Sequence, residues 1–226
     1  MDIQMNYIEK GKGMPLVLLH GNGENNDFFV NQIEYFSAFY RVLAVDTRGH
    51  GKSPRGVKPF TIEQFADDLK DFLDLHGIEK AYILGFSDGA NIAIAFALKY
   101  QSYVEKLILN GGNLNPKGVK GIYQIPIIIA YSLVSFVSLF DKKAIVKKEM
   151  LGLMVNQPDF KEEELSKIHV STLVIAGKND MIKEKHTILI HKAIKNSHLC
   201  FVEGDHFIAY KNSTEFNEKV KAFLSN

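Results

Sequence analysis

The segment 85–89 has the sequence G-F-S-D-G, with Ser87 between two glycines. An apolar run, 81–84, precedes it, and a run rich in small residues, 90–98, follows it. Between a strand and a helix, a G-x-S-x-G turn is so tight that the residues two positions from the serine must be small, and it holds the hydroxyl above the sheet. Ser87 is therefore predicted to be a nucleophile. The alternative is an ordinary glycine-rich turn in which Ser87 caps the helix.

A serine nucleophile needs a base that accepts its proton and an acid that orients the base. Asp180 follows the apolar run 172–176, and His206 follows the apolar run 199–202. Because ligands bind at the carboxyl ends of parallel strands, we expect both side chains to lie near Ser87. The order serine, acid, histidine is the one that accompanies G-x-S-x-G.

The remaining acids and histidines compete poorly for these roles. Asp205 adjoins His206, so its side chain is not expected to point the same way, and the other histidines lie in turn, linking or helical segments. His20 and His50 lie in turns and are expected to hold loops by hydrogen bonds. No pair of histidines or acids has the spacing of a metal site, so neither a metal nor another cofactor is implied.

Acyl transfer also needs donors aimed at the developing oxyanion. One predicted donor is the backbone N–H of Asp88, the residue after the nucleophile. The other is a backbone N–H of the loop 20–23, which has the sequence H-G-N-G, and we assign it to Asn22. A phosphate-binding loop is the competing interpretation of these glycines, but neither phosphate-loop spacing is present.

Short apolar runs alternate with helix-like segments along the chain, the pattern of a mostly parallel sheet covered on both faces. Buried strands are predicted at 15–20, 42–46, 81–85, 104–110, 172–176 and 199–202, with a flanking strand within 1–9. Apolar residues at helical spacing predict helices over 61–76 and 213–224.

Predicted strands are missing between 114 and 167. This segment contains a run without a charged residue, from Ile122 to Phe140. Its length is near the lower limit for a membrane-spanning helix. Gln124, Pro126 and its position between two strands favour instead a buried helix that covers the site. The lysine-rich stretch 141–148 is predicted to be a solvated face, and contact with a lipid surface is the alternative.

The composition limits which classes of protein this chain could belong to. The 226 residues, 46% of them hydrophobic and 23% charged, are sufficient for one domain with a real core. The net charge of +1 gives no reason to expect a nucleic-acid partner. Cys200 is the one cysteine, which excludes an intramolecular disulfide, and it is expected to be buried. The first residues lack a signal-peptide pattern, so a cytoplasmic location is expected.

Together these motifs resemble the α/β-hydrolase superfamily over almost the whole chain. The matching segments are the oxyanion loop at 20–23, the D-x-R-G-x-G-x-S turn at 46–53, the nucleophile elbow at 85–89, the acid-bearing segment 173–180 and the histidine-bearing segment 204–207. The resemblance implies an α/β-hydrolase fold: a mostly parallel twisted sheet with helices on both faces and a short helical cap. It implies one domain, 1–226, with a short cap at about 114–167 and therefore a more open pocket. It also implies a mainly structural role for the turn 46–53.

A serine rather than an aspartate at position 87 argues against the haloalkane dehalogenase and epoxide hydrolase branches. The expected activity is hydrolysis of a carboxylic ester of a small or medium apolar acyl compound, through an acyl-enzyme and without a cofactor. A C–C bond hydrolase, a thioesterase or a cofactor-free haloperoxidase could use the same three residues. A non-hydrolytic ligand-sensing protein on this fold is the alternative of another class. The physiological substrate and the oligomeric state stay open.

Overall fold

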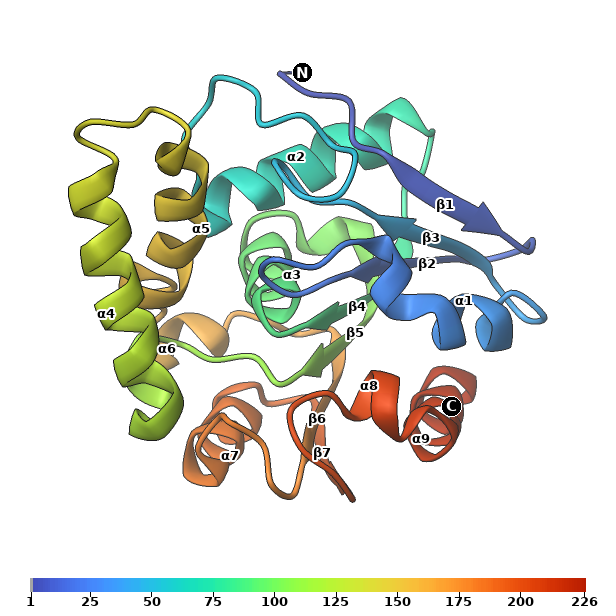
Figure 1. The fold of residues 1–226 in the computed structure, drawn as a ribbon. Helices are drawn as coiled ribbons and strands as arrows, with labels where there is room; N and C mark the ends of the chain where they lie inside the picture. Colours follow the sequence, from blue (N-terminus) through green and yellow to red (C-terminus); the bar gives the residue numbers. More distant parts are fainter. Residues whose placement is uncertain (1) are drawn as a thin grey trace.

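The computed structural model describes residues 2–226, and seven strands of this part of the chain form one sheet in the order β1-β3-β2-β4-β5-β6-β7 (Figure 1). The strands are β1 (Tyr7–Lys10), β2 (Pro15–Leu19), β3 (Arg41–Val45), β4 (Ala81–Phe86), β5 (Val104–Asn110), β6 (Ser171–Gly177) and β7 (Ser197–Val202). Only β1 is antiparallel to its neighbour. The predicted mostly parallel sheet is confirmed.

Two details at the edges of the sheet differ from the prediction. The flanking strand predicted within 1–9 is β1, which begins at Tyr7, and Met1 lies outside the described residues. Cys200 is half-buried rather than fully buried, because it lies on the edge strand β7.

Helices cover both faces of the sheet. They are α1 (Val30–Phe36), α2 (Ile62–Leu75), α3 (Asp88–Lys99), α4 (Gly121–Val137), α5 (Ala144–Asn156), α6 (Glu162–Leu165), α7 (Glu184–Ala193), α8 (Ile208–Lys211) and α9 (Ser213–Ser225), with 3-10 turns at Asn26–Phe29, Gln101–Tyr103 and Pro116–Gly118. One hydrophobic core joins the sheet to α2, α3 and α7, and the other joins the opposite face to α1, α8 and α9.

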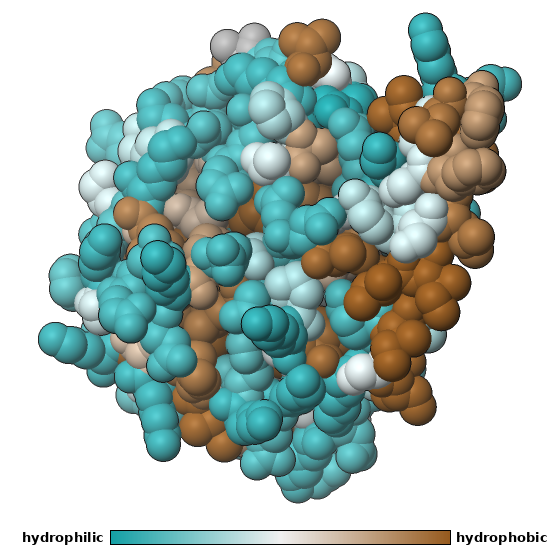
Figure 2. Space-filling model, turned by 90° about the vertical axis from the view of Figure 1, so that its left-hand side faces the viewer, coloured by the Kyte–Doolittle hydropathy of each residue, from teal (hydrophilic) through white to brown (hydrophobic). Residues whose placement is uncertain are grey.

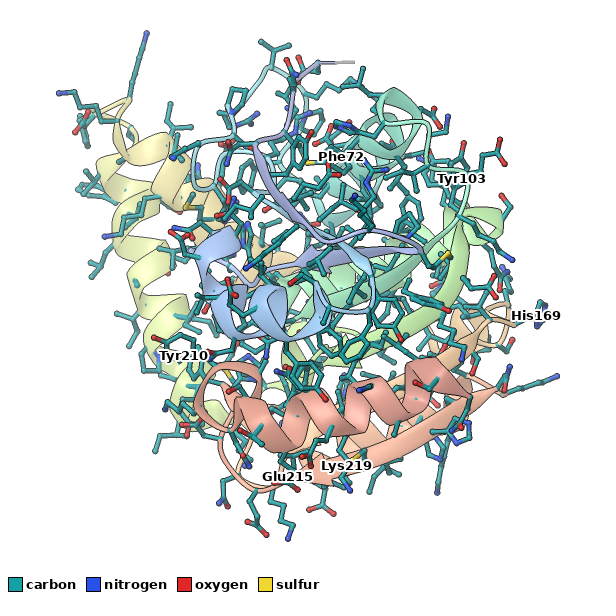
Figure 3. The ribbon with its side chains drawn as sticks, turned by 90° about the vertical axis from the view of Figure 1, so that its right-hand side faces the viewer. Phe72, Tyr103, His169, Tyr210, Glu215 and Lys219 are labelled. Atoms are coloured by element: carbon teal, nitrogen blue, oxygen red, sulfur yellow. The ribbon has the colours of Figure 1, made fainter. Side chains whose placement is uncertain are left out.

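The sequence of α2 explains how these helices dock. Thr61 caps its first turn by accepting a hydrogen bond from the Gln64 N–H at 3.1 Å. Apolar residues then recur every three or four positions, and Phe72 is buried against the sheet. Figure 3 shows Phe72 inside the molecule, while Lys219 of α9 lies on the solvent side of its helix.

The turn after β3 is held by buried polar contacts. Asp46 accepts hydrogen bonds from the backbone N–H groups of Asn26 (2.8 Å) and Lys52 (2.9 Å). A side chain at Gly51 would lie 2.3 Å from the Asp46 carboxyl carbon, so this position needs a glycine. These contacts agree with the structural role expected for the turn.

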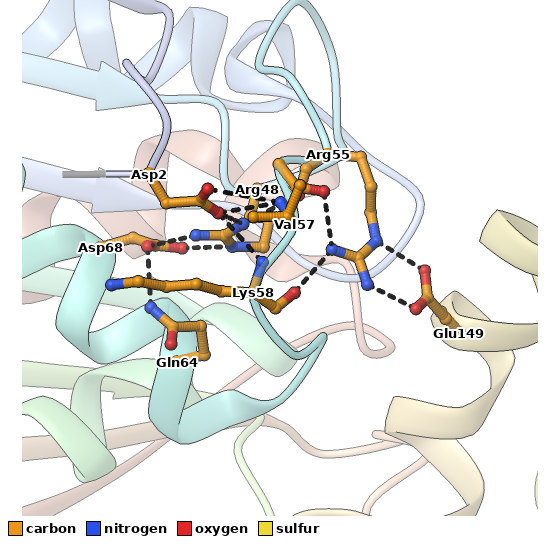
Figure 4. Close-up of polar contacts among 9 residues, drawn as sticks. Asp2, Arg48, Arg55, Val57, Lys58, Gln64, Asp68 and Glu149 are labelled. Atoms are coloured by element: carbon orange, nitrogen blue, oxygen red, sulfur yellow. Dashed lines mark hydrogen bonds and ion pairs between the residues drawn. The ribbon is translucent and has the colours of Figure 1, made fainter.

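Arg48 of the same turn is fully buried, and Figure 4 shows it between two carboxylates. Its guanidinium pairs with Asp68 of α2 at 2.6 Å and with Asp2 at 2.5 Å. A buried guanidinium needs such partners, because an unpaired charge in the interior is strongly destabilising. The pairs therefore join the turn to α2 and to the N-terminal segment.

The segment between β5 and β6 contains α4, α5 and α6, and α4 lies along one side of the molecule, packed against α5 (Figure 1). The helix predicted within 122–140 exists, but the expectation that it is buried is wrong. Gln124 is the only buried residue of α4, whereas Ile122 is 77% exposed and Phe136 is 65% exposed. Across residues 2–226, no helix is both long enough and apolar enough to cross a membrane.

Candidate functional site

Ser87 lies at the sharp turn between β4 and α3. Its φ of 55° makes it the one residue other than glycine with a positive φ in the described chain. A Cβ at Gly85 would lie 2.2 Å from the carbonyl oxygen of Gly89, and a Cβ at Gly89 would lie 2.0 Å from that of Leu19. Both positions therefore need glycine. The Ser87 side chain makes no capping hydrogen bond, so it does not act as a helix cap.

His206 links the other two predicted residues. Its Nε2 lies 3.0 Å from Ser87 Oγ, and its Nδ1 lies 2.7 Å from Asp180 Oδ1. Asp180 follows β6, His206 follows β7, and both are buried. A side chain at Gly111, after β5, would lie 2.8 Å from His206 Cε1, so this glycine leaves room for the imidazole ring. The structure therefore brings Ser87, Asp180 and His206 together as the sequence predicted.

The predicted oxyanion residues lie beside Ser87 and are joined to each other. Asn22 Nδ2 donates to Asp88 Oδ2 at 2.9 Å, and Asn91 Nδ2 donates to Asp88 Oδ1 at 3.1 Å. Burial raises the pKa of the Asp88 carboxyl. Asp88 is the first residue of α3, and an N–H at that position has no acceptor within its own helix. The loop 20–23 is thus held against the start of α3, where two backbone N–H groups could receive an anion.

His20 fixes the backbone of this loop. Burial lowers the pKa of His20 to about 4, so the imidazole is neutral at neutral pH. Its Nε2 accepts from the Thr47 N–H at 3.0 Å, and its Nδ1 therefore donates to the Gly21 carbonyl at 2.7 Å. His50 similarly bonds the Arg48 carbonyl at 2.9 Å. Both histidines hold loops, as expected.

Glu24 is a residue of the site that the sequence reasoning missed. Its carboxylate accepts from the Gly21 N–H at 3.1 Å, and burial raises its pKa to about 7. A methyl group at Gly21 would lie 3.1 Å from both Glu24 Oε2 and Ser87 Cβ, so the carboxyl group is beside the nucleophile. Glu24 directly follows the H-G-N-G motif of 20–23, and neither a motif nor a periodicity marks it.

A cavity of about 20 Å³ adjoins Ser87, which is room for roughly one water molecule. The residues that line it are Ser87, Asp88, Asn113, Val119, Gln124, Met154, Gln157, Met181 and Ile182. Four of them belong to the cap segment 114–167. The short cap therefore lies over Ser87 and leaves little free volume beside it. Gln124 Oε1 is buried without a hydrogen-bond partner in the described chain.

Polar contacts attach the cap to the sheet-bearing part of the protein. Asn22 Nδ2 also donates to the Met150 carbonyl of α5 at 2.8 Å. Arg55, which follows the turn 46–53, pairs with Glu149 of α5 through two bonds of 2.5 and 2.7 Å (Figure 4). The loop 20–23 and the turn thus both position α5 over the site.

Comparisons with known proteins agree with the fold and with a hydrolytic site. Residues 14–124 match the model of the alpha/beta hydrolase fold family. The chain is 30% identical to a proline iminopeptidase of Saccharolobus solfataricus, over 96% of this chain and 87% of that protein. It is 29% identical to 2-hydroxy-6-oxononadienedioate/2-hydroxy-6-oxononatrienedioate hydrolase 2 of Pseudomonas putida, over 100% and 93%. A lipase-esterase related protein of Clostridium acetobutylicum has a similar fold, with a TM-score of 0.80 and 21% identity over 97% and 99% of the two chains.

Proposed function

Because the chain belongs to the α/β-hydrolase family, we propose that it is a serine hydrolase that cleaves a carboxylic ester of a small or medium apolar acyl compound. The observation that carries this proposal is the continuous hydrogen-bonded chain from Asp180 through His206 to Ser87. The Ser87 hydroxyl is within proton-transfer distance of a base, and the base is oriented by an acid.

In the proposed reaction, His206 accepts the Ser87 proton while Oγ attacks the carbonyl carbon of the ester. The imidazolium is stabilised by Asp180 and then donates its proton to the leaving alcohol. An acyl group stays on Ser87. His206 next removes a proton from water, which attacks the acyl carbon and releases the carboxylic acid and the free serine.

The backbone N–H groups of Asn22 and Asp88 form the proposed oxyanion hole. Each would donate to the oxygen that becomes negative when Ser87 attacks. Loss of one such donor typically lowers the rate by about 100- to 1000-fold. The neutral His20, through the Gly21 carbonyl, keeps the first of these groups in place.

The lining of the cavity favours an uncharged acyl compound. Its residues are apolar, amide-bearing or hydroxyl-bearing apart from Asp88, and none of those described carries a positive charge. Glu24 adds a second carboxyl group beside Ser87. A substrate with several carboxylates would meet the carboxyl group of Asp88 in this lining, whereas Lys120 lies outside the lining and donates to the Asp180 carbonyl at 2.6 Å.

Cleavage of a C–C bond is the second candidate, because of the relative from Pseudomonas putida. The name of that relative's substrate describes a hydroxy-oxo dienedioate, which contains neither an ester nor an amide, so its hydrolysis breaks a C–C bond. Such a substrate carries two carboxylates, and the cavity beside Ser87 offers them no cation. The ester is therefore the preferred substrate class.

The test is hydrolysis of p-nitrophenyl esters of increasing acyl length by the wild type and by Ser87→Ala. The wild type is expected to turn over, and the variant to lose about 10⁴-fold or more in kcat with unchanged stability. Ser102→Ala, an exposed serine distant from the site, is the matched control and keeps full activity.

A second arm offers a 2-hydroxy-6-oxo dienoate. A folded wild type that cleaves it and no ester would replace the ester proposal by C–C hydrolysis through the same residues. A folded protein that cleaves neither compound would contradict the hydrolase proposal and favour ligand sensing.

A further inference from the structure

We infer that α4 and the loop after it form a surface that docks on a negatively charged lipid bilayer. This inference goes beyond the proposed function and does not depend on it, since it rests on residues outside the cavity of Ser87. The docking surface consists of the outward side of α4, the residues 138–143 and the first turn of α5.

The apolar side chains of α4 form one continuous stripe that faces outward. Its members recur at intervals of three and four residues: Ile122, Ile125, Ile129, Leu133, Phe136 and Phe140, each at least 55% exposed. This is the reverse of an ordinary surface helix, whose apolar stripe faces the core. Nothing in the described chain covers the stripe.

Exposed apolar residues are concentrated here and not spread over the molecule. Of the nineteen large apolar side chains that are exposed in residues 2–226, twelve lie between 122 and 146. Figure 2 shows a column of hydrophobic surface along the right-hand edge of that view. Contiguous patches of this kind mark contact with a protein or a membrane.

Positive charge lies at one end of the stripe. Lys142 and Lys143 follow Phe140, and Lys147 lies on the first turn of α5; all three are exposed. Between 121 and 147, the range of the docking surface, the chain carries three lysines and one acidic residue, Asp141, a charge of +2, although the whole chain carries only +1. The remaining residues therefore carry a net charge of −1, and the docking surface is positive relative to the rest of the chain.

This charge distribution favours a lipid surface over a second copy of the chain. A two-fold symmetric dimer would place the same patch on both subunits in contact, so a second copy supplies no excess of negative charge to pair with the lysines. An anionic bilayer attracts the same lysines and receives the apolar stripe, the combination found in helices that lie in the membrane interface. Because no described helix can cross a membrane, α4 would lie along the bilayer surface.

The test is co-sedimentation of the full chain with vesicles of phosphatidylcholine alone and of phosphatidylcholine mixed with phosphatidylserine. The wild type is expected to bind the mixed vesicles and to be released by salt. Leu133→Ser combined with Phe136→Ser should weaken binding by about tenfold or more, since both side chains would enter the acyl region. Lys142→Gln, Lys143→Gln and Lys147→Gln together should weaken it by a similar factor.

The matched control replaces two exposed apolar residues outside the docking surface, Val57→Ser and Leu75→Ser, and should leave binding unchanged. Equal unfolding midpoints in urea show that all variants are folded. Failure to bind either kind of vesicle would overturn the proposal. A dimer in light scattering that Leu133→Ser and Phe136→Ser dissociate, without vesicle binding, would assign the surface to a second copy. Equal binding to both vesicle types, insensitive to the lysine changes, would overturn the role of charge.

Discussion

Helices α2 and α4 both lie at the surface of this protein, but they turn opposite sides to the solvent. In α2, the apolar residues Ile62, Phe65 and Phe72 pack against the sheet. In α4, a glutamine is the one buried residue, and most of the isoleucines and Phe136 are exposed. The difference shows that docking on the sheet orients α2, whereas contact with α5 alone leaves most of α4 uncovered.

The sheet-bearing part and the cap also differ in the side chains that they supply to the cavity. The sheet-bearing part supplies Ser87 and Asp88 to the lining and places Glu24 near Ser87, outside the lining; these groups can react or titrate. The cap supplies Val119, Gln124, Met154 and Gln157, none of which titrates. The groups that can react therefore lie in the sheet-bearing part, and the cap contributes to the shape of the cavity.

The largest expected effect contrasts Phe72→Ala on α2 with Phe136→Ala on α4. Phe72 is 2% exposed, so its removal leaves a cavity and should lower the free energy of unfolding by about 3–5 kcal/mol. Phe136 is 65% exposed, and its removal should change that free energy by less than about 0.5 kcal/mol. Urea unfolding of both variants measures the two values. A loss above about 2 kcal/mol in Phe136→Ala would mean that the outer side of α4 is covered in solution.

A smaller effect concerns the charge of Glu24, which lies near Ser87 in the sheet-bearing part. Burial raises the pKa of Glu24 to about 7, so its carboxyl group is neutral below that pH and negative above it. As the pH rises from 6 to 8, kcat/KM for a negatively charged ester should fall about three- to tenfold relative to a neutral ester of the same size. The ratio of the two substrates removes the effects of pH that are common to both esters.

Glu24→Gln is the matched variant, since it keeps the size of the side chain and removes the titration. In this variant the ratio of the two substrates should not change with pH. A ratio that still falls in Glu24→Gln would assign the titration to another group, such as the buried carboxyl of Asp88.

The sheet and the positions of Ser87, Asp180 and His206 were predictable from the sequence, because short segments of sequence determine them. Central strands are apolar on both faces. Glycine is required at positions 85 and 89, because a Cβ at either position would lie about 2 Å from a backbone oxygen. The polar residues that follow β6 and β7 had to meet at one edge of the sheet.

The burial of α4 and the presence of Glu24 in the site could not be predicted in the same way. A run that is apolar on every side, such as 122–140, contains no pattern that distinguishes a covered helix from an uncovered one. Glu24 lies near Ser87 because of the path of the loop after β2, which depends on the bonds of Asn26 to Asp46 and of His20 to Thr47, residues far apart in the sequence. The exposure of α4 and the position of Glu24 both depend on tertiary contacts, which no local spacing of residues encodes.

The smallest expected effect tests the attachment of the cap. Arg55 binds Glu149 of α5, and Arg41 binds Glu9 within the sheet by a similar two-pronged pair of comparable exposure. Arg55→Gln and Arg41→Gln should each lower the free energy of unfolding by less than about 1 kcal/mol, since such pairs contribute little. Arg55 contacts α5 and Arg41 does not. Of the two variants, therefore, only Arg55→Gln should change KM for the ester. An equal change of KM in Arg41→Gln would show that a change within the sheet affects substrate binding as much as a change in the attachment of the cap. The difference between the two parts would then not extend to substrate binding.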